Sequence, residues 1–595
     1  MIKHLLSALG ILLFSHSGLF AQVKKDYALP PTPIRLNQIG YYPKSQKIAL
    51  VIGGDTLGKK FSIVTEDGKD TVFRGNLVNA GVWQYSEEMV NQADFSSLTK
   101  PGSYVLYVPK AGLSYPFDIK PHVYLPVAKA SLKGFYYQRA STELLPEHAG
   151  KFARKAGHMD TAVLVHPSAA TATRPADTKI NCTKGWYDAG DYNKYIINSG
   201  ISTYTLMALY EHFPKFMDTL NVNIPESKNQ IPDVLDEALW NIRWIMSMQD
   251  EDGGVYFKLT NSGFDGSVMP ERATSPRYVI QKTTASALDF CAVMAQASRV
   301  FAKYKKQMPG FSDSCLTMAK KAYAWAKKNP NILYSQKAMN DQFDPNVETG
   351  EYGDSNISDE FQWAAIELFA ATGKMDYYEE ANLPGTLNTK FGLPSWPDVN
   401  TLGLYTLISL KSKYPSLEGM DAVTEQIIKM ATPMKEYAEK SPYKTTMGVD
   451  ASNFGWGSNS ASANQGMLLL IAYEITKDKS YLEAAMSCLD YLLGRNATGY
   501  SFMTGYGERS TFNPHHRPSE SDGIKEPVPG LLAGGPNPGQ QDSPSSCYNK
   551  YPSKLPAKSY VDHKCSYASN EIAINWNAPF AFLSLGIEAI KAGQK

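Results

Sequence analysis

The hydrophobic pattern of this 595-residue chain changes near Pro121, and that change constrains the fold more than any other feature. Before it, the apolar segments are short and rich in β-branched and aromatic residues, as in 47–52, 60–65 and 103–108. Turn-forming Gly, Asp and Pro residues separate them. Short strands at this spacing predict a small β-sandwich between about residues 34 and 119.

After Pro121 the apolar residues recur at helical spacing, in about twelve segments. These segments are 125–143, 192–213, 230–248, 283–304, 312–328, 359–373, 375–384, 400–412, 421–440, 464–476, 479–494 and 570–592. An even set of helices of this size fits an α/α toroid, in which inner and outer helices alternate. Four loops are longer than the connectors of a compact domain, and loops of that length usually carry function. They span 145–190, 250–282, 330–358 and 500–568.

The start of the chain is typical of a secretory signal peptide. A basic start is followed by an apolar run from Leu5 to Phe20 and by a small residue, Ala21. The protein is therefore expected to be periplasmic or secreted, and no later stretch is apolar enough to span a bilayer. The expected organisation is a signal peptide at 1–22, a β-sandwich at 33–120 and a helical domain at 121–595.

Charge and cysteine content exclude some classes of function. The formal net charge of +1 argues against nucleic acid or an anionic membrane surface as the partner. The cysteines contain no C-x-x-C pair, so a zinc-ribbon or redox motif is not supported. Export permits disulfides, but the spacing assigns no pair, and the cysteines in helical apolar patterns are expected to be buried thiols. The six are Cys182, Cys291, Cys315, Cys488, Cys547 and Cys565, of which Cys291 and Cys488 lie in such patterns.

A first candidate site is the turn Asp188-Ala-Gly-Asp191. Glycine allows a tight turn at the entry to a helix, and such a turn can aim both carboxylates at one spot, where they could hold a water molecule. For this motif taken alone, an Asp N-cap with a turn partner is the more ordinary interpretation.

A second candidate site lies in the loop that contains His515 and Arg517, which follow one proline and precede another. A rigid extended loop that presents both side chains on one side can bind hydroxyl groups or an anion. The alternative is a solvated polar loop. The pair His515-His516 has no further His or Cys at ligand spacing, so a metal site is not favoured.

A third candidate site is the aromatic-rich stretch 560–579, which carries Asp562 and Glu571. Glu571 stands where the apolar run of the last predicted helix begins. A carboxyl group in such a place can be partly desolvated, which raises its pKa and suits a general acid. An Asn-Glu pair before an apolar run is also an ordinary helix start.

Taken together and in this order, the three segments resemble glycoside hydrolase family 9, the cellulase family of inverting β-glucanases. The first looks like the Asp-Ala-Gly-Asp segment of the family. The second is similar to its histidine signature at Thr504, Gly507, Arg509, Pro514, His515 and Arg517. The third is similar to its acidic signature at Tyr560, Asp562, Tyr567, Glu571, Ala573, Asn577 and Ala578. The resemblance implies an (α/α)6 barrel catalytic domain preceded by a small immunoglobulin-like β-sandwich, and thus a mainly α chain.

The resemblance also implies roles for individual residues. Glu571 matches the general acid, Asp191 the general base that activates water, and Asp188 its partner. Inversion needs acid and base on opposite faces of the sugar, roughly 6.5–9.5 Å apart. Asp562 is implied to orient or tune the site, and His515 to bind sugar hydroxyls. Further substrate-binding candidates are Arg517 and the stacking residues Trp456, Tyr506 and Trp186, for which core packing is the alternative.

Family members often bind calcium near the start of a helix, and Asp359 and Glu360 match ligand positions, with Ser355 as a weaker candidate. Oxygen ligands suit Ca²⁺. The alternative is an acidic helix start stabilised by the helix dipole. No cofactor is expected for the chemistry, and the Cys/His clusters of zinc-binding relatives are not found.

The leading prediction is an inverting endo-β-1,4-glucanase, expected to be a monomer, that hydrolyses cellulose-type glucans, mixed-linkage glucans or xyloglucan. Many relatives have His after the aspartate turn, where this chain has Tyr192, which leaves the exact glucan open. One alternative is an exo-acting relative of the β-glucosidase or glucosaminidase type. Another is a non-catalytic glycan-binding protein on the same fold, although simple binding would not need Asp188, Asp191 and Glu571.

Overall fold

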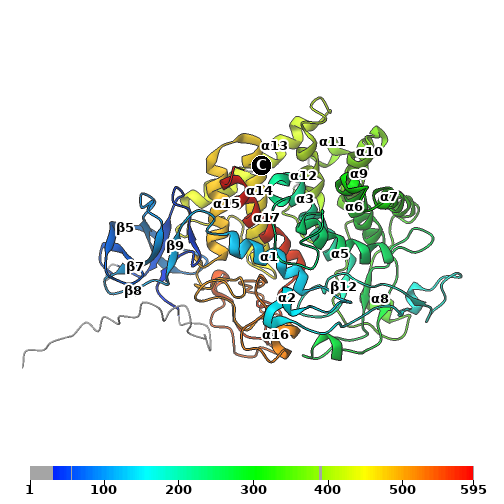
Figure 1. Cartoon of the computed structure of the whole chain (residues 1–595), viewed down its shortest axis with the longest axis horizontal. Coiled ribbons are helices and arrows are strands. Elements are labelled where there is room, and N and C mark those ends of the chain that lie inside the picture. The colour runs from blue at the N-terminus through cyan, green and yellow to red at the C-terminus, as the bar shows by residue number, and fades with distance from the viewer. Residues whose placement is uncertain (1–30, 55–56, 388–390, 594–595) are drawn as a thin grey trace, which may run out of the picture.

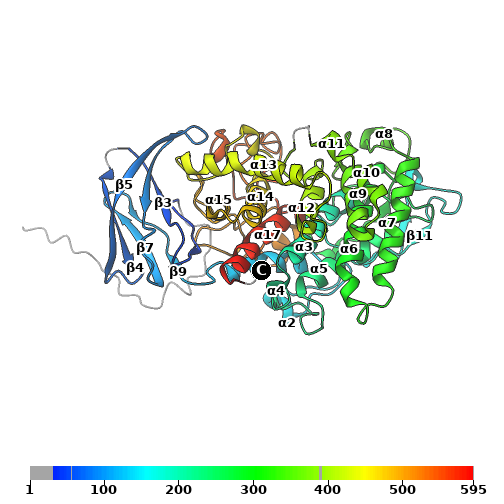
Figure 2. The same cartoon turned by 90° about the horizontal axis from the view of Figure 1, so that it is seen from above.

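The computed structural model describes residues 31–54, 57–387 and 391–593, so the predicted signal peptide lies outside the described residues. The N-terminal strands β1–β9 form one end of the molecule, and the helices lie in the rest of it (Figures 1 and 2). No helix in the described part of the chain is both long and apolar enough to cross a membrane.

The N-terminal strands form a β-sandwich in the order β1-β3-β6-β5-β4-β7-β9-β2, with β8 on β7. Their bounds are β1 Ile34–Arg35, β2 Gly40–Tyr41, β3 Ile48–Ile52, β4 Lys60–Thr65, β5 Thr71–Trp83, β6 Glu88–Asp94, β7 Gly102–Val108, β8 Gly112–Leu113 and β9 Phe117–Ile119. The long β5 pairs with β4 in one layer and with β6 in the other, and its register shifts between Asn79 and Gly81. Alternate residues such as Phe61 and Ile63 face the shared core, as the period of two requires.

Twelve principal helices follow in the described part of the chain, one for each segment predicted from the sequence. Six carry apolar residues around their whole circumference: α3 Ile196–His212, α6 Thr284–Val300, α9 Ser358–Thr372, α12 Asn400–Leu410, α14 Ser458–Thr476 and α17 Ile574–Lys591. The other six keep a polar outer face: α1 Leu125–Tyr137, α5 Asp233–Ser247, α7 Phe311–Lys328, α10 Met375–Glu380, α13 Met420–Lys440 and α15 Lys479–Leu492. Short helices lie at α2 Pro146–Ala149, α4 Pro214–Met217, α8 Gln336–Asn340, α11 Leu383–Thr386 and α16 Arg517–Ser521.

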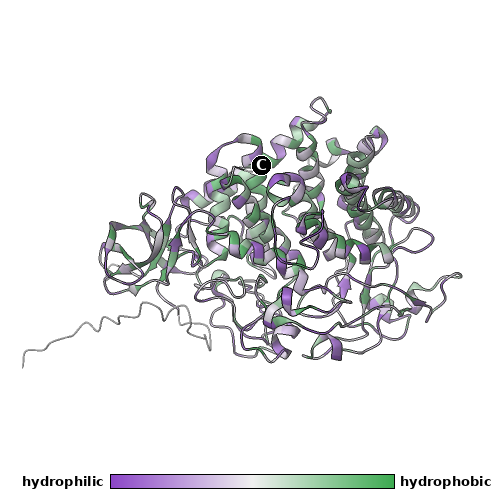
Figure 3. Cartoon of the chain, in the orientation of Figure 1, coloured by the Kyte–Doolittle hydropathy of each residue, from purple (hydrophilic) through white to green (hydrophobic). Residues whose placement is uncertain are grey.

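Along the chain, helices with a polar outer face alternate with helices that lack one, which is the pattern of an (α/α)6 barrel. The inner helices α3, α6, α9 and α12 pack in succession, and α17 packs against both α14 and α3. Hydrophilic and hydrophobic residues are mixed along the outer helices (Figure 3). The predicted fold class, including the immunoglobulin-like β-sandwich, is therefore confirmed.

The candidate residues gather where inner helices begin. The aspartate turn precedes α3, Trp456 stands two residues before α14, and Glu571 stands three residues before α17. An outer helix precedes each inner helix and runs the opposite way, so the N-terminal ends of the inner helices share one face of the domain. The long loops gather on this face, below the helices in Figure 1, where β12, α8 and α16 are labelled.

A second, five-stranded sheet in these loops was not predicted from the sequence. Its order is β11-β10-β14-β13-β12, with β10 Val163–Val165, β11 Lys179–Ile180, β12 Lys194–Tyr195, β13 Lys258–Thr260 and β14 Tyr278–Val279. Each strand has only two or three residues, too few to show a period in the sequence. The sheet pairs β12, directly after the aspartate turn, with β13.

The sandwich is fixed against the helical domain by buried polar and aromatic contacts. The ring of Trp83 on β5 lies 4.2 Å from that of Tyr443. The side-chain amide of Asn37 donates to the Asp490 carboxylate of α15 at 2.8 Å. These contacts join the two parts through side chains that are buried on both sides.

Candidate active site

Asp188 is the first residue of the turn before β12, and 1% of its surface is exposed. Its carboxylate accepts hydrogen bonds from the Asn198 side-chain amide at 3.0 and 3.1 Å and from the Tyr352 hydroxyl at 3.0 Å. Burial, together with the charge of Asp191, raises the pKa of Asp188 to about 8 despite these bonds. The ordinary N-cap interpretation is therefore wrong for Asp188, because its carboxylate meets side-chain donors and caps no helix.

Asp191 is also buried, and its position is fixed by Asn193. The Asn193 side-chain amide donates to Asp191 Oδ2 at 2.5 Å. The carbonyl oxygen of the same amide accepts from the Thr260 hydroxyl at 3.0 Å and from the Asn261 N–H at 3.1 Å. Thr260 of strand β13 and the neighbouring Asn261 thus fix the Asn193 side chain, which in turn fixes Asp191.

Glu571 lies on an extended segment three residues before α17, so it does not cap that helix. Its backbone is bridged to His515, and its carbonyl accepts from the Gly534 N–H at 2.8 Å. Glu571 Oε1 accepts a hydrogen bond from the Gly190 N–H at 3.3 Å. A Cβ at residue 190 would lie 2.2 Å from the His515 carbonyl oxygen, so only glycine lets the aspartate turn approach this closely.

The environment of Glu571 favours its protonated form. Burial, followed by the negative charges of Asp191 and Asp188, raises the pKa of Glu571 well above its ordinary value. Arg517 offsets part of this effect. A carboxyl group whose pKa is raised in this way, close to two other carboxyl groups, suits a general acid.

His515 and Arg517 lie against the same turn. His515 Nδ1 lies 2.7 Å from the Lys564 carbonyl oxygen and therefore carries the proton, which leaves Nε2 as an acceptor. Burial lowers the pKa of His515, so the ring is neutral. Arg517 donates through Nη1 to the Gly190 carbonyl at 2.9 Å and through Nε to the Asp265 carbonyl at 2.9 Å. The three sequence motifs therefore meet at one place.

Comparison with known proteins identifies this architecture. The model of glycosyl hydrolase family 9 matches residues 124–584, and the model of the cellulase N-terminal ig-like domain matches residues 30–112. The chain belongs to glycosyl hydrolase family 9. The predicted family and the prediction of a glycoside hydrolase are thereby confirmed.

Relatives of known function and structure cover nearly the whole chain. A xyloglucan-specific endo-beta-1,4-glucanase of Bacteroides ovatus is 44% identical over 566 residues, which are 94% of each protein. A cellulose 1,4-beta-cellobiosidase of Acetivibrio thermocellus is 33% identical over 95% of this chain and 68% of its own. The solved structure titled Bacteroides ovatus GH9 matches with a TM-score of 0.87 at 43% identity, covering 94% of this chain and 99% of its own.

In this family 9 chain, Asp562 clamps the loop that leads to His515. Its oxygens accept from the N–H groups of Phe512 at 2.9 and 3.1 Å and of Asn513 at 2.7 Å. The Asn570 side-chain amide donates to it at 3.3 Å. These contacts are those of a residue that orients the site.

Of the three predicted stacking residues, only Trp456 presents a ring at the site. It is 49% exposed, and its ring lies 5.6 Å from that of Tyr567, which is 6.3 Å from the His515 ring. The interpretation of Trp186 as a stacking residue is wrong, because its ring is fully buried against Phe135. Tyr506 packs partly buried against the main core, and no ring contact or hydrogen bond in the described chain joins it to the carboxylates.

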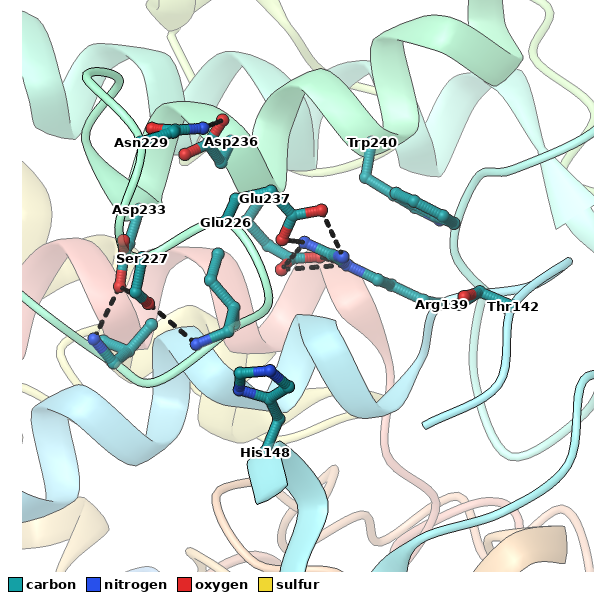
Figure 4. A network of polar contacts seen from close by, with 12 residues as sticks. Arg139, Thr142, His148, Glu226, Ser227, Asn229, Asp233, Asp236, Glu237 and Trp240 are labelled. Atoms are coloured by element: carbon teal, nitrogen blue, oxygen red, sulfur yellow. Dashed lines mark hydrogen bonds and ion pairs between the residues drawn. The ribbon is translucent and has the colours of Figure 1, made fainter. Parts of the chain in front are cut away.

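Trp186 instead anchors the aspartate turn to a buried ionic network. Its ring N–H donates to Glu237 at 2.8 Å. Arg139 lies between Glu237 and Glu226, with contacts of 2.8 and 3.0 Å, and its guanidinium stacks on the Trp240 ring (Figure 4). The network fixes Trp186, two positions before Asp188. No spacing in the sequence indicated this network.

The predicted calcium ligands Asp359 and Glu360 lie in the first turn of α9, in a larger acidic cluster. Asp359 accepts from the Val399 N–H and the Asn356 amide, whereas neither oxygen of Glu360 meets a donor in the described chain. The same holds for Asp289 on α6 and for one oxygen each of Asp354 and Asp398, which the sequence did not single out. Ser355 is exposed beside the cluster.

These carboxyl groups repel one another. Burial, with Asp354 and Asp359, raises the pKa of Asp289 well above its ordinary value. Buried carboxyl oxygens without donors fit a cation. Within the described residues, only Cys547, His563 and Cys565 place three ligand atoms within 4.8 Å of one another, so a bound cation would draw the carboxylates closer together.

Cys547 and Cys565 form a disulfide across 18 residues, a pairing that the sequence did not assign. The sulfurs are therefore not free to bind a metal with His563. The bridge fixes the segment whose Lys564 carbonyl holds His515. Cys182, Cys291, Cys315 and Cys488 are buried thiols, as predicted for two of them.

Sequence reasoning missed Tyr352, Asn193 and Asn198, which hold the two aspartates. Asn198 lies near the start of α3, which is buried on almost every side but carries several other polar residues, so the sequence does not mark Asn198 out. Tyr352 gave no signal, since its contact with Asp188 spans 164 residues. Tyr192, the departure from the family pattern, lies in the core beside the His158 ring, and its hydroxyl donates to the Val268 carbonyl.

Proposed function

We propose that this enzyme is an inverting endo-β-1,4-glucanase with xyloglucan as its preferred substrate. The observation that carries the chemistry is the hydrogen bond from the Gly190 N–H to Glu571, which places a carboxyl group of raised pKa against the turn that bears Asp188 and Asp191. The substrate is supported by the 44% identity to a xyloglucan-specific relative over 94% of both chains.

In this proposal Glu571 gives its proton to the glycosidic oxygen as the bond to the anomeric carbon breaks. Asp191 takes a proton from the water that attacks the opposite face of the sugar, and Asp188 holds that water. The incoming hydroxyl group enters opposite the leaving oxygen, so the new reducing end has the inverted, α configuration. After the product leaves, Asp191 loses its proton to solvent and Glu571 takes up a proton from solvent, which restores the starting state.

We also propose that the enzyme acts as a monomer outside the cytoplasm, since residues 1–22 have the pattern of a signal peptide. Neutral His515, with Nε2 free to accept, and the ring of Trp456 would bind sugar hydroxyls and a sugar face, respectively.

A panel of soluble polysaccharides tests the substrate and the mode of cleavage together. The panel contains xyloglucan, mixed-linkage β-glucan, carboxymethyl cellulose and cellotetraose, and both viscosity and reducing ends are followed. We expect the highest kcat/KM on xyloglucan, with viscosity falling before many reducing ends appear. Release of cellobiose or glucose alone, with viscosity retained, would show an exo-acting enzyme instead.

We further propose that the acidic cluster of Asp289, Asp354, Asp359, Glu360 and Asp398 holds a structural Ca²⁺. Hard oxygen ligands without donors suit this ion, and its charge would remove the mutual repulsion. The cluster lies at the start of α9, beyond Tyr352, and the ion would stabilise that part of the loop face without entering the chemistry.

Chelation should therefore lower the melting temperature. An ion present at one hundred times its Kd adds about 2.7 kcal/mol to the free energy of unfolding, so EDTA should lower Tm by several degrees and excess CaCl₂ should restore it. Glu360→Gln should abolish this response. The matched control Glu367→Gln, on the same helix but bonded to Arg299, should keep it. A wild-type Tm that is the same in EDTA and CaCl₂ would rule out the calcium site.

A further inference from the structure

A fully buried lysine lies directly behind the aspartate turn. Lys258 is on β13, opposite Tyr195 of β12, and its side chain has no exposed surface. The ammonium donates to the Gly350 carbonyl at 2.7 Å, to Gln336 Oε1 at 2.9 Å and to the Thr349 hydroxyl at 3.2 Å. Removing an ammonium group from water costs desolvation free energy, and an apolar side chain would fill the same space without that cost. Its presence here therefore indicates a role for Lys258 other than packing.

One branch of contacts leads from Lys258 to Asp188. The Gly350 N–H donates to the Tyr195 hydroxyl at 3.1 Å, and the Tyr195 ring lies 4.8 Å from that of Tyr352. The Tyr352 hydroxyl donates to Asp188 Oδ2 at 3.0 Å. By fixing Gly350, the lysine fixes the segment that presents Tyr352 to the first aspartate.

A second branch leads from Lys258 to Asp191 through a chain of hydrogen bonds. Thr349 and Thr260 share a hydroxyl–hydroxyl bond of 2.6 Å, and Thr260 donates to the Asn193 carbonyl oxygen at 3.0 Å. Asn193 donates to Asp191 at 2.5 Å. The Thr260 hydroxyl also lies 3.0 Å from the Asn261 carbonyl oxygen, but when it donates to Asn193 it accepts from Thr349, and every bond in the chain then points from the lysine to the aspartate. Bonds oriented in one direction polarise one another and strengthen the chain.

Charge also links Lys258 to the site. The charged groups that face it are Asp191, ahead of β12, and Glu351, next to Gly350. The other facing groups, Tyr195 and Tyr334, are phenols whose rings lie 5.5 and 5.2 Å from the ammonium. Burial lowers the pKa of Lys258 to about 7, and the attraction of Asp191 and Glu351 opposes that shift.

We infer that Lys258 is a positioning residue for both aspartates, fixing Tyr352 and Asn193 from behind and placing a positive charge opposite Asp191. The inference rests on the proposed role of Asp188 and Asp191 as the pair that holds and activates water. Lys258 does not touch the substrate, because its side chain is wholly enclosed.

Lys258→Met removes the charge and all three donors at nearly constant volume. We expect kcat on the preferred glucan to fall by about 10²-fold with little change in KM, because the base and its water are misplaced while the sugar sites remain. We also expect the acidic limb of the pH profile of kcat/KM to move to higher pH by about half a unit to one unit, since a positive charge near the carboxylates favours their ionised forms.

Thr349→Val is the second variant, because it interrupts the chain of bonds while the ammonium stays. We expect kcat to fall several-fold while the acidic limb stays in place. The matched control is Lys47→Met in the β-sandwich. Lys47 is equally buried and donates to the carbonyls of Pro43 and Ser45 at 2.9 and 2.8 Å, so its loss should lower Tm and leave the pH profile unmoved.

The inference is wrong if folded Lys258→Met keeps the wild-type kcat and pH profile, or if it only loses Tm as Lys47→Met does. It is also wrong if Thr349→Val moves the acidic limb as far as Lys258→Met does. Asp191→Asn and Glu571→Gln are assayed alongside. Activity in those two would overturn the proposed catalytic roles, whereas their inactivity beside an unaffected Lys258→Met would overturn the role of the lysine alone.

Discussion

Glu571→Gln should lower kcat on unactivated glucans by about 10²–10⁴-fold, the range in which general acid catalysis acts. The amide keeps the shape of the side chain and can still accept from the Gly190 N–H, but it has no proton to give to the leaving oxygen. An aryl β-cellobioside with a strongly acidic phenol needs no such proton, so its bond-breaking step should be much less affected. Initial rates on both substrates measure the difference.

The same variant should not be less stable than the wild type. Burial raises the pKa of Glu571, so the folded chain holds this proton to a higher pH than the unfolded chain does. As pH rises from the unfolded pKa towards the folded one, the wild type therefore loses stability that Gln keeps. Near neutral pH, the Tm of Glu571→Gln should equal or exceed that of the wild type.

A buried glutamate outside the site provides the control. Glu588 accepts from the Tyr42 hydroxyl at 2.6 Å and from the Tyr124 N–H at 3.0 Å. Glu588→Gln should lower Tm and leave kcat of the folded enzyme unchanged. Full activity of Glu571→Gln on an unactivated glucan would show that another group is the acid.

Asp191→Asn should lower kcat by a similar factor, and on both kinds of substrate. The base acts on water, not on the leaving group, so an activated phenol cannot compensate for its loss. The Asn carbonyl oxygen can still accept from Asn193, which keeps the turn in place. Equal fold losses on the glucan and on the aryl glycoside would distinguish this residue from Glu571.

Asp490→Asn is the matched control for the aspartate. Asp490 is buried, pairs with Arg495 at 2.8 Å and accepts from Asn37, far along the chain from the turn. Its substitution should reduce Tm without changing kcat. If Asp191→Asn kept more than a tenth of the wild-type kcat, the assignment of the base would fail.

The helices of this enzyme could be predicted because their apolar residues recur at helical spacing. The residues at which the helices begin and end could not be predicted. The predicted start of the last helix at residue 570 included Glu571, whereas α17 begins at Ile574. Residues 570–573 are held by bridges to His515 and Ala533, two partners that no local pattern reveals. The start of α14 was placed six residues late, because its first turns carry buried polar residues that interrupt the apolar pattern.

The three carboxyl groups that the structure brings together were singled out because three segments kept the order and spacing of a known family. The residues that hold them were not, since Tyr352 and Lys258 lie in long loops and act on residues far away in the chain. For Trp186 the sequence left stacking on a sugar and core packing open, because a tryptophan beside the aspartate turn suits both equally well. The Trp186 ring is buried because it packs against Phe135, and no local pattern in the sequence indicates this contact.

The anomeric form of the first product tests the central claim most directly, because it reports on which face of the sugar the water attacks. Proton NMR during the first minutes of hydrolysis, before mutarotation, separates the two anomers. An acid at Glu571 opposed to a base at Asp191 predicts that the α-anomer appears first and decays to the equilibrium mixture. First appearance of the β-anomer would contradict it, because retention requires a carboxylate that attacks the sugar itself.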